Sequence, residues 1–454
     1  MRQDAASYRD NDGFIFEHEG LHYRLVQPGY AEHYARLMQS SLYDELISRG
    51  QLIAHKEVQN FAHPDIPVEG KVLLPEQVPF ISYPYEWSFS QWKDAALLTL
   101  DIALSALEKD MILKDATPFN VQFMGCRPVF IDTLSFECYR EGEPWVAYNQ
   151  FCKTLLGPLL LMHYCHPGTR SFFAVHPEGI PLDMLVALLP RKARWNLQVY
   201  LHIYLQAKMS AKPGKTTATT PAFSRNKMKV LLKSLHGLVS GLSAKKTKTA
   251  WDDYYTDTIL GDDYLQHKFR LVNQLLGDRY FSAVIDLGAN DGHFTLLLKD
   301  RADLLVALDA DPNCIDSLYR GLQTAKTGNI LPLVADLTTP SPAIGWNNAE
   351  RKSLTERCRA ELVMALALVH HLAIGHNVPP GMIARWLQPM APLLLVEFVP
   401  KEDEKVQLLL RNREDIFEQY TLAGFKAAFE EYYIIQEEAR VGNTDRILFL
   451  MKRK

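Results

Sequence analysis

V-I-D-L-G-A-N-D-G, from Val284 to Gly292, is the stretch around which the C-terminal half of this 454-residue chain is organised. An apolar run that gives way to glycine and asparagine predicts a buried parallel strand and then a tight turn, in which backbone N–H groups can approach a ligand. A second apolar run ends in Asp309, about 20 residues further on, where the hydroxyl pair of a ribose would find an acceptor. The stretch therefore predicts a site for a nucleotide-like cofactor.

The spacing of the glycines indicates which cofactor to expect. Gly288 and Gly292 form the pattern G-x-x-x-G, whereas units that bind the pyrophosphate of a dinucleotide carry G-x-G-x-x-G. S-adenosylmethionine (SAM) has no pyrophosphate, and its cationic sulfonium and amino-acid end favour nearby carboxylates and carbonyls. We therefore expect SAM.

Apolar strands alternate with helices through the C-terminal half. The predicted strands are 284–287, 304–308, 330–335, 362–368, 393–398, 433–436 and 446–451. Such alternation requires a parallel sheet covered on both faces. The last two strands have no helix between them, so they form an antiparallel edge hairpin, which distinguishes class I methyltransferases from dinucleotide dehydrogenases. We predict an α/β fold, a Rossmann-like class I methyltransferase domain with a seven-stranded sheet over residues 251–454.

The expected cofactor site lies outside the carboxyl ends of these strands, as in other open α/β sheets. Asp309 is predicted to accept from the ribose hydroxyls, and Asp336 from the adenine amino group. The methionine end is expected to be shaped by Asp286, Gly288, Asn290 and Gly292. Each aspartate alone could be a helix N-cap, but three at successive strand ends beside a glycine-rich turn favour a cofactor site.

Two histidines follow the fourth strand in A-L-A-L-V-H-H-L, where the methyl group would meet its acceptor. His370 or His371 could be a general base that takes a proton from an attacking hydroxyl. The alternative is that one histidine packs and the other faces solvent. No N-P-P-Y-like tetrapeptide and no Pro-Cys nucleophile occurs here, which argues against methylation of bases or glutamine.

A second informative stretch, Met111 to Glu137, lies in the N-terminal half. Asp115, four intervening residues, Asn120, two short apolar strands and Asp132 have the layout of a kinase catalytic loop with its metal-binding aspartate. The order of elements over residues 14–205 resembles the protein-kinase and aminoglycoside-kinase fold. We predict an α+β kinase-like domain over 1–205, and the resemblance implies an ATP and Mg²⁺ site at these three residues.

Departures from the kinase pattern leave an alternative open. No glycine-rich loop precedes the first strands, Leu113-Lys114 replaces His-Arg, and Asp132 stands in I-D-T rather than D-F-G. Arg24 holds the strand position of the phosphate-binding lysine, with Glu45 as its candidate ion partner. The alternative is a kinase-like scaffold, possessing no nucleotide site, in which Asp115 and Asn120 cap the loop.

Residues 206–250 are predicted to be a basic linker. Ten Lys or Arg residues and no Asp or Glu lie between Gln206 and Trp251. Phe223 to Leu242 has the pattern of a basic amphipathic helix, which could contact an anionic membrane or an acidic partner. The alternative is a helix docked on one of the chain's own domains.

Composition limits the remaining function classes. A chain of this length favours two domains, and 47% hydrophobic with 22% charged residues is typical of a globular protein. Six cysteines lack C-x-x-C and metal-ligand spacings, which predicts reduced thiols and a cytoplasmic location. The longest apolar run, Leu155 to Met162, is too short to span a bilayer. A net charge of -4 argues against nucleic acid as the substrate.

Several segments resemble bacterial SAM-dependent methyltransferases related to rhizobial nodulation methyltransferases. They are D-L-T-T-P-S-P-A-I-G-W from Asp336, A-L-A-L-V-H-H-L-A-I-G-H-N-V-P from Ala365 and V-E-F-V-P-K-E-D from Val396, with L-K-D-A-T-P-F-N-V-Q-F and F-I-D-T-L-S-F-E in the N-terminal half. The resemblance implies methyl transfer to a small-molecule or carbohydrate-type acceptor. Two alternatives remain: a bifunctional kinase and methyltransferase, and a kinase-like scaffold that recruits a macromolecular partner.

Overall fold

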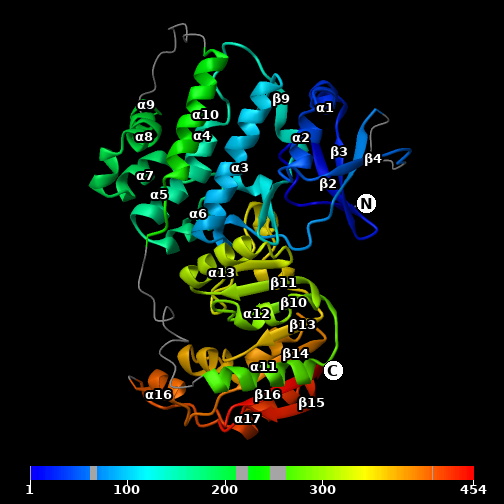
Figure 1. Cartoon of the computed structure of the whole chain (residues 1–454), viewed down its shortest axis with the longest axis vertical. Helices are drawn as coiled ribbons and strands as arrows, with labels where there is room; N and C mark the ends of the chain where they lie inside the picture. The colour runs from blue at the N-terminus through cyan, green and yellow to red at the C-terminus, as the bar shows by residue number, and fades with distance from the viewer. Residues whose placement is uncertain (1, 62–68, 211–222, 246–261, 412) are drawn as a thin grey trace. The chain divides into compact units, whose positions relative to one another are not determined.

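The computed structural model describes residues 2–61, 69–210, 223–245, 262–411 and 413–454. The chain divides into two compact units (Figure 1). Unit 1 comprises Met1–Thr247 and Ala343–Lys352, and unit 2 comprises Lys248–Pro342 and Ser353–Lys454. Within the described residues, no helix is both long enough and apolar enough to cross a membrane.

Unit 1 begins with a five-stranded sheet in the order β1-β2-β3-β5-β4. Its strands are β1 (Arg2–Gln3), β2 (Gly13–His18), β3 (Leu21–Val26), β4 (His55–Val58) and β5 (Lys71–Pro75). Strands β2 and β3 form a hairpin, with Glu19 (φ 51°) and Gly20 (φ 77°) in the left-handed region at the turn. Every pairing in this sheet is antiparallel.

Two parts of this region depart from a single regular element. Residues 30–48 form two helices, α1 (Ala31–Gln39) and α2 (Leu42–Ser48), because Ser41 between them has φ 62°. Residues 78–83 form no strand. Pro79 has no N–H for a ladder, and the N–H of Ser82 donates instead to Oε1 of Gln122 at 2.9 Å.

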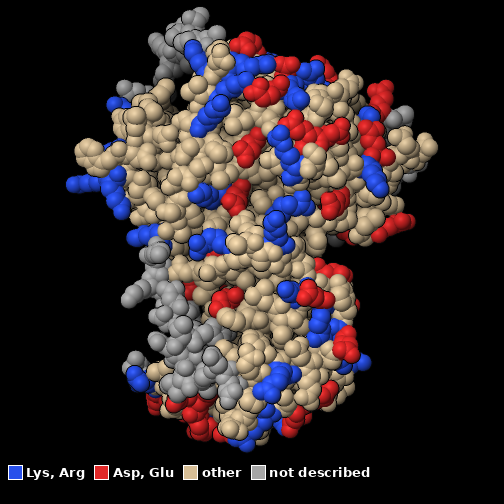
Figure 2. All heavy atoms as spheres, viewed as in Figure 1, with Lys and Arg blue, Asp and Glu red and all other residues tan. Residues whose placement is uncertain are grey.

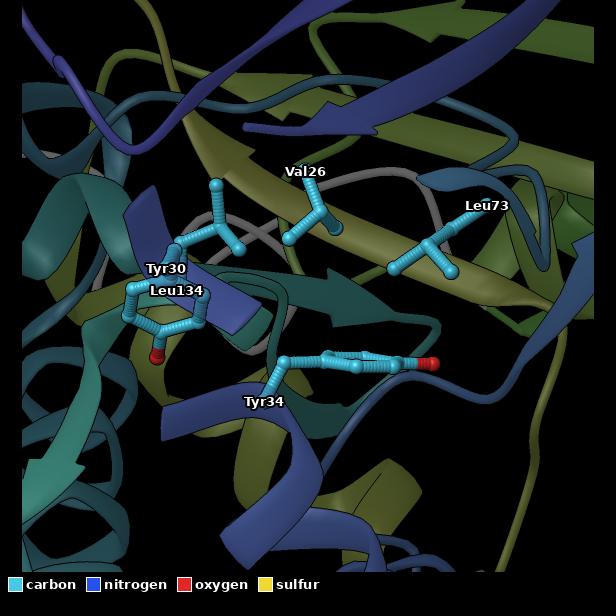
Figure 3. Close-up of a cluster of buried hydrophobic side chains, with 5 residues drawn as sticks. All are labelled: Val26, Tyr30, Tyr34, Leu73 and Leu134. Carbon is cyan, nitrogen blue, oxygen red and sulfur yellow. The ribbon is translucent and has the colours of Figure 1, made fainter. Parts of the chain in front are cut away.

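The core under this sheet joins three parts of unit 1. Val26 on β3 and Leu73 on β5 pack against Tyr30, Tyr34 and Leu134, and the five side chains point toward one another (Figure 3). All five are at most 2% exposed. Burial of each side chain contributes about 1.5–3 kcal/mol, so the cluster fixes the sheet to α1 and to the segment around Leu134.

The rest of unit 1 is mostly helical. Its long helix α3 (Phe89–Glu108) begins at Ser88, which forms a capping box with Gln91. Two antiparallel strand pairs follow: β6 (Met111–Leu113) with β9 (Phe136–Cys138), and β7 (Val121–Met124) with β8 (Arg127–Phe130). The later helices are α4 (Tyr148–Phe151), α5 (Gly157–Tyr164), α6 (Phe172–Val175), α7 (Leu182–Leu188), α8 (Leu197–Val199), α9 (Gln206–Ser210) and α10 (Arg225–Ser240).

Part of the predicted linker is a helix, α10, that belongs to unit 1. Residues 211–222 lie outside the described residues, but α10 belongs to unit 1 and packs along α3. Its apolar stripe is buried, and its cations pair with acids of unit 1: Arg225 with Asp110, and Lys229 with Glu108 at 2.7 Å. The stripe is therefore covered by the chain's own domain, as the alternative of a docked helix predicts, and is not free to contact a membrane.

The segment Ala343–Lys352 completes unit 1. The hydroxyl of Tyr8 donates to Glu350 at 2.5 Å, and Arg9 donates to the same carboxylate at 2.9 Å. The guanidinium of Arg351 lies 4.3 Å from the ring centroid of Phe119. Both the N-terminus and the region around β7 thus make contacts with this short segment.

Unit 2 contains the predicted seven-stranded sheet, in the order β12-β11-β10-β13-β14-β16-β15. Its strands are β10 (Phe281–Leu287), β11 (Ala302–Asp309), β12 (Ile330–Val334), β13 (Leu362–Ala365), β14 (Leu393–Phe398), β15 (Tyr433–Arg440) and β16 (Ile447–Arg453). The first five are parallel, and β16 is antiparallel to both β14 and β15. The antiparallel edge hairpin that the sequence predicts for the last two strands is present as β15 and β16.

Helices connect the parallel strands (Figure 1). They are α11 (Asp262–Leu276), α12 (His293–Leu297), α13 (Pro312–Ala325), α14 (Leu354–Arg357), α15 (Pro380–Leu387), α16 (Glu404–Leu410) and α17 (Leu422–Glu430). Helix α13 packs on β11 and β12, while α15 packs on α17. The strand order reverses between β10 and β13, and a ligand site is expected at that switch point, beyond the carboxyl ends of the strands.

Candidate active site

The turn after β10 adopts the conformation that its residue types predict. Gly288 (φ 77°), Asn290 (φ 51°) and Gly292 (φ 83°) are all left-handed. The N–H groups of Gly288 and Ala289 both donate to the carbonyl oxygen of Leu308, at 2.8 and 3.0 Å. The turn is thereby fixed to the end of β11. A Cβ added at Gly292 would lie 2.6 Å from Cδ1 of Leu318, so this position also needs glycine for space.

A cavity opens at the carboxyl ends of β10, β11, β12 and β13. Five of the six predicted cofactor residues line it: Asp286, Gly288, Asn290, Asp309 and Asp336. Gly292 does not line the cavity; it allows the left-handed turn beside it and packs against Leu318. The cavity wall is completed by Lys268, Ala289, Phe294, Ala310, Ala335, Leu337, Thr338, Leu366, Ala367, Leu368, His371, Leu372 and His376.

Asp286 is the most deeply placed of the three carboxylates. Its side chain is buried and accepts a hydrogen bond from Oγ1 of Thr295 at 2.6 Å. Burial raises the pKa of Asp286 to about 6, and the neighbouring Asp309 adds to the rise, while Thr295 and Lys268 oppose it. A buried carboxyl with this pKa can change its protonation state when a cation arrives beside it.

Asp309 and Asp336 are held by backbone N–H groups. Oδ2 of Asp309 accepts from the N–H of Asn290 and Oδ1 from that of Asp311, both at 2.8 Å. Burial raises the pKa of Asp309, although these hydrogen bonds oppose the rise. Asp336 is exposed and accepts from the N–H and hydroxyl of Thr338; its pKa is lowered because these bonds outweigh its partial burial.

The two candidate catalytic histidines have different surroundings. His371 lines the cavity, and burial with the nearby His376 and Arg446 lowers its pKa to about 4. His370 is fully buried and does not line the cavity; neither of its ring nitrogens has a hydrogen-bond partner among the residues that the structure describes. Burial lowers the pKa of His370 well below its usual range. Of the pair, His371 alone lines the cavity.

A buried ionic network next to the cavity was not predicted from the sequence. Nζ of Lys268, which lines the cavity, donates to Oε2 of Glu397 at 2.6 Å. Oε1 of Glu397 accepts from the hydroxyl of Tyr264 at 3.0 Å and lies 3.8 Å from Arg446. Arg446 in turn binds both carboxylate oxygens of Asp403, at 2.7 and 2.9 Å. Glu397 lies beside two cations, so its pKa is lowered despite complete burial.

This network also holds the backbone of the cavity wall. Ala367, directly after β13, has φ 49°, a conformation that alanine rarely adopts. Its N–H donates to Oε2 of Glu397 at 2.7 Å. Glu397 therefore connects the ammonium of Lys268 on one side of the cavity with the strained turn before His371 on the other.

In unit 1, the three residues predicted to bind a nucleotide contact neighbouring protein side chains. Asp132 pairs with Arg24 and accepts from the hydroxyl of Ser135 at 2.5 Å, and the Asn120 amide donates to the same hydroxyl at 2.9 Å. The expected pair of Arg24 with Glu45 was wrong, since Glu45 lies beside Arg49 and Lys109. Asp115 is 3.4 Å from the Gln150 amide. The described residues include no group of three or more His, Cys, Asp or Glu side chains that could hold a metal ion.

Comparison with known proteins gives one relative over the full chain. No family model matches the sequence. Among solved structures, the N-methyltransferase NodS from Bradyrhizobium japonicum WM9, in complex with S-adenosylhomocysteine (SAH), is 15% identical over 44% of this chain and 92% of NodS, with a TM-score of 0.33. WbdD in complex with the kinase inhibitor LY294002 is 16% identical over 48% of this chain and 47% of WbdD, with a TM-score of 0.31.

The relative known from sequence is the nodulation protein NoeA of Rhizobium meliloti (strain 1021). It is 33% identical over 464 residues, which cover 99% of this chain and 96% of NoeA. The similarity thus extends through both units and through the segment between them. The chain belongs to the same family as the nodulation protein NoeA.

Proposed function

We propose that unit 2 is a SAM-dependent methyltransferase. The observation that carries the proposal is the meeting of three strand-end carboxylates, from β10, β11 and β12, at one cavity of a sheet whose last strand is antiparallel. A glycine-rich left-handed turn borders the same cavity. Carboxylates and a close backbone suit the ribose, the ammonium group and the sulfonium of SAM better than they suit a pyrophosphate.

The charges of the cavity fit the two ends of the cofactor. Asp309 can accept from ribose hydroxyls, because each of its oxygens has one backbone donor and a further lone pair. Asp286 would face the amino group of the methionine end, and the ammonium of Lys268 its carboxylate. Asp336 would accept from the adenine amino group. When bound, SAM supplies an activated methyl group, so the protein has mainly to position the reactants.

The acceptor side of the cavity contains His371. With a pKa of about 4 its imidazole is neutral at neutral pH, so it can accept a proton from an acceptor hydroxyl or amine. We propose a small-molecule or carbohydrate-type acceptor, in line with the nodulation name of the relative. Untargeted metabolite profiling of a deletion strain, searched for a species lighter by one methyl group, identifies the acceptor.

Calorimetric titration with SAM and SAH tests the cofactor proposal. Asp309→Ala removes a charged acceptor; the loss of one hydrogen bond to such a group, about 1.5–3 kcal/mol, should lower the affinity by about 10- to 100-fold. Asp303→Ala is the matched control, because Asp303 is an exposed aspartate on the same strand. Unchanged affinity in Asp309→Ala, or a wild-type chain that binds neither ligand, contradicts the proposal.

For unit 1 we propose a kinase-like scaffold that binds no nucleotide. Asp115 and Asn120 lie between β6 and β7, and their order along the chain is what supports a kinase-like scaffold. Asp132 is instead neutralised by Arg24 and hydrogen-bonded to Ser135. Mg²⁺ and ATP should therefore leave the thermal stability of unit 1 unchanged. Stabilisation by Mg-ATP that disappears in Asp132→Ala would favour the bifunctional alternative.

A further inference from the structure

One helix of unit 1 presents an apolar row to solvent. Helix α8, the wider turn Tyr200–Leu205 and α9 run on from one another, from Leu197 to Ser210. Leu197, Leu201, Leu205 and Met209 recur at every fourth position, which places them along one side. Leu197 is 69%, Leu201 43% and Met209 68% exposed, while Leu205 is half-buried. An amphipathic helix usually turns such a row toward the core.

Cations and a tryptophan lie at the start of this row. Trp195 is 89% exposed, and Arg191, Lys192 and Arg194 around it are exposed too. None of the three cations forms an ion pair with a described residue. Arg194 lies 4.9 Å from the ring centroid of Tyr204, so part of this basic cluster rests on an aromatic side chain.

The chain segment that contains the row carries positive charges and no acidic residue. No Asp or Glu occurs between Asp183 and Asp252. Figure 2 shows lysine and arginine beside uncharged residues, and no acidic side chain, at the left edge where Figure 1 places α7 and α8. Exposed tryptophan and leucine flanked by Lys and Arg are the residue types that bind at the interface of anionic lipids.

We propose that this surface, defined by Arg191, Lys192, Arg194, Trp195 and the row Leu197, Leu201 and Met209, binds the face of an anionic lipid bilayer. The occupant is a bilayer rather than nucleic acid because the row consists of aliphatic side chains, which cannot stack on bases. The surface is also distinct from α10, whose apolar stripe is buried against α3. The contact is peripheral: side chains enter the headgroup region while the helix lies on the surface.

Sedimentation of the full chain with lipid vesicles tests the proposal. The chain should bind vesicles that contain phosphatidylserine, bind phosphatidylcholine vesicles weakly, and dissociate as salt is added. Each cation at an anionic surface contributes about fivefold to binding, so the triple variant Arg191→Glu, Lys192→Glu, Arg194→Glu should lose about 100-fold or more. The double variant Leu197→Ser, Met209→Ser should lose binding at low salt, where the wild-type chain binds most tightly.

Matched controls keep the test specific. Lys326→Glu and Met382→Ser, at exposed positions of unit 2, should leave vesicle binding unchanged. Unaltered melting and SAH binding show that each variant is folded. Three results overturn the proposal: no preference for phosphatidylserine, equal losses in the controls, or a dimer that the Leu197→Ser, Met209→Ser variant dissociates. Tight binding of mixed-sequence single-stranded RNA that the triple variant alone loses, without vesicle binding, also overturns it.

Discussion

Replacing Asp286 by Asn should make unit 2 more stable at neutral pH while weakening its cofactor site. Burial raises the pKa of this carboxyl from 3.8 to about 6. Below about pH 4 the carboxyl is protonated in both the folded and the unfolded chain, so it costs no stability. Between about pH 4 and pH 6 the unfolded chain loses this proton while the folded chain keeps it, and the stability of unit 2 falls.

The magnitude follows from the size of the shift. Two pH units at about 1.36 kcal/mol each give a penalty of about 3 kcal/mol, which is complete above about pH 6. Asparagine carries no charge and can still accept from Thr295, so Asp286→Asn should remove this penalty. For a unit of about 200 residues, 3 kcal/mol corresponds to about 6–12 °C in melting temperature.

Differential scanning calorimetry of the full chain measures the effect. The transition of unit 2 is the one whose melting temperature rises when SAH is added to the wild-type chain. The variant and the wild type should melt together near pH 4, and the variant should melt higher at pH 8. Asp303→Asn, at an exposed position on β11, should show no difference that depends on pH.

A lower melting temperature for Asp286→Asn at pH 8 would refute this reasoning, because it would mean that the folded state prefers the ionised carboxylate. Lys268 would then outweigh burial. Cofactor binding gives a second readout, since the variant has no carboxylate for the methionine amino group. We expect the affinity of the wild-type chain for SAH to rise between pH 5 and pH 7, and that rise to be absent from the variant.

Three further perturbations probe the same unit. Glu397→Gln leaves Lys268 and Arg446 buried beside a neutral group, so it should lower the free energy of unfolding by about 3–5 kcal/mol in chemical denaturation. The control Glu438→Gln breaks an exposed pair with Lys426 and should cost under about 1 kcal/mol; equal losses in the two variants would contradict the network. Gly292→Ala, at φ 83° and against Leu318, should cost about 1–3 kcal/mol in the same assay, and a neutral result would show that the turn tolerates a side chain. His371→Gln should lower the methylation rate and leave the affinity for SAH unchanged. The wild-type rate should be level from pH 5 to pH 8 and fall only toward pH 4, where the imidazole becomes protonated; a rate that titrates near pH 6.5 would contradict the low pKa of His371.

The elements that carry local signals could be predicted from the sequence. The runs around Leu305 and Ile330 are apolar, as strands buried on both faces must be, and each ends near an aspartate; the run at Val284 is apolar apart from Asp286 near its end. The glycines of the first turn are needed at their positive φ angles. For these reasons the sheet and five lining residues of the cavity followed from residue types and spacing alone.

The buried network could not be found in the same way. Lys268 and Glu397 are 129 positions apart, and nothing near either residue specifies its partner. One signal was present: a glutamate within the apolar run L-L-L-V-E-F needs a buried cation, because an unpaired buried charge is too costly. The left-handed Ser41 and Ala367 were also missed, since neither residue type favours that conformation and tertiary contacts impose it.

The segment Ala343–Lys352 has a consequence for how the chain is made. Glu350 binds Tyr8 and Arg9, which leave the ribosome more than 300 residues earlier. The first unit therefore stays incomplete during synthesis until about half of the C-terminal unit has been translated. A gene shortened after Thr247 would encode an N-terminal fragment whose Arg9 lacks one carboxylate partner, and supplying the missing peptide in trans should restore part of its resistance to proteolysis.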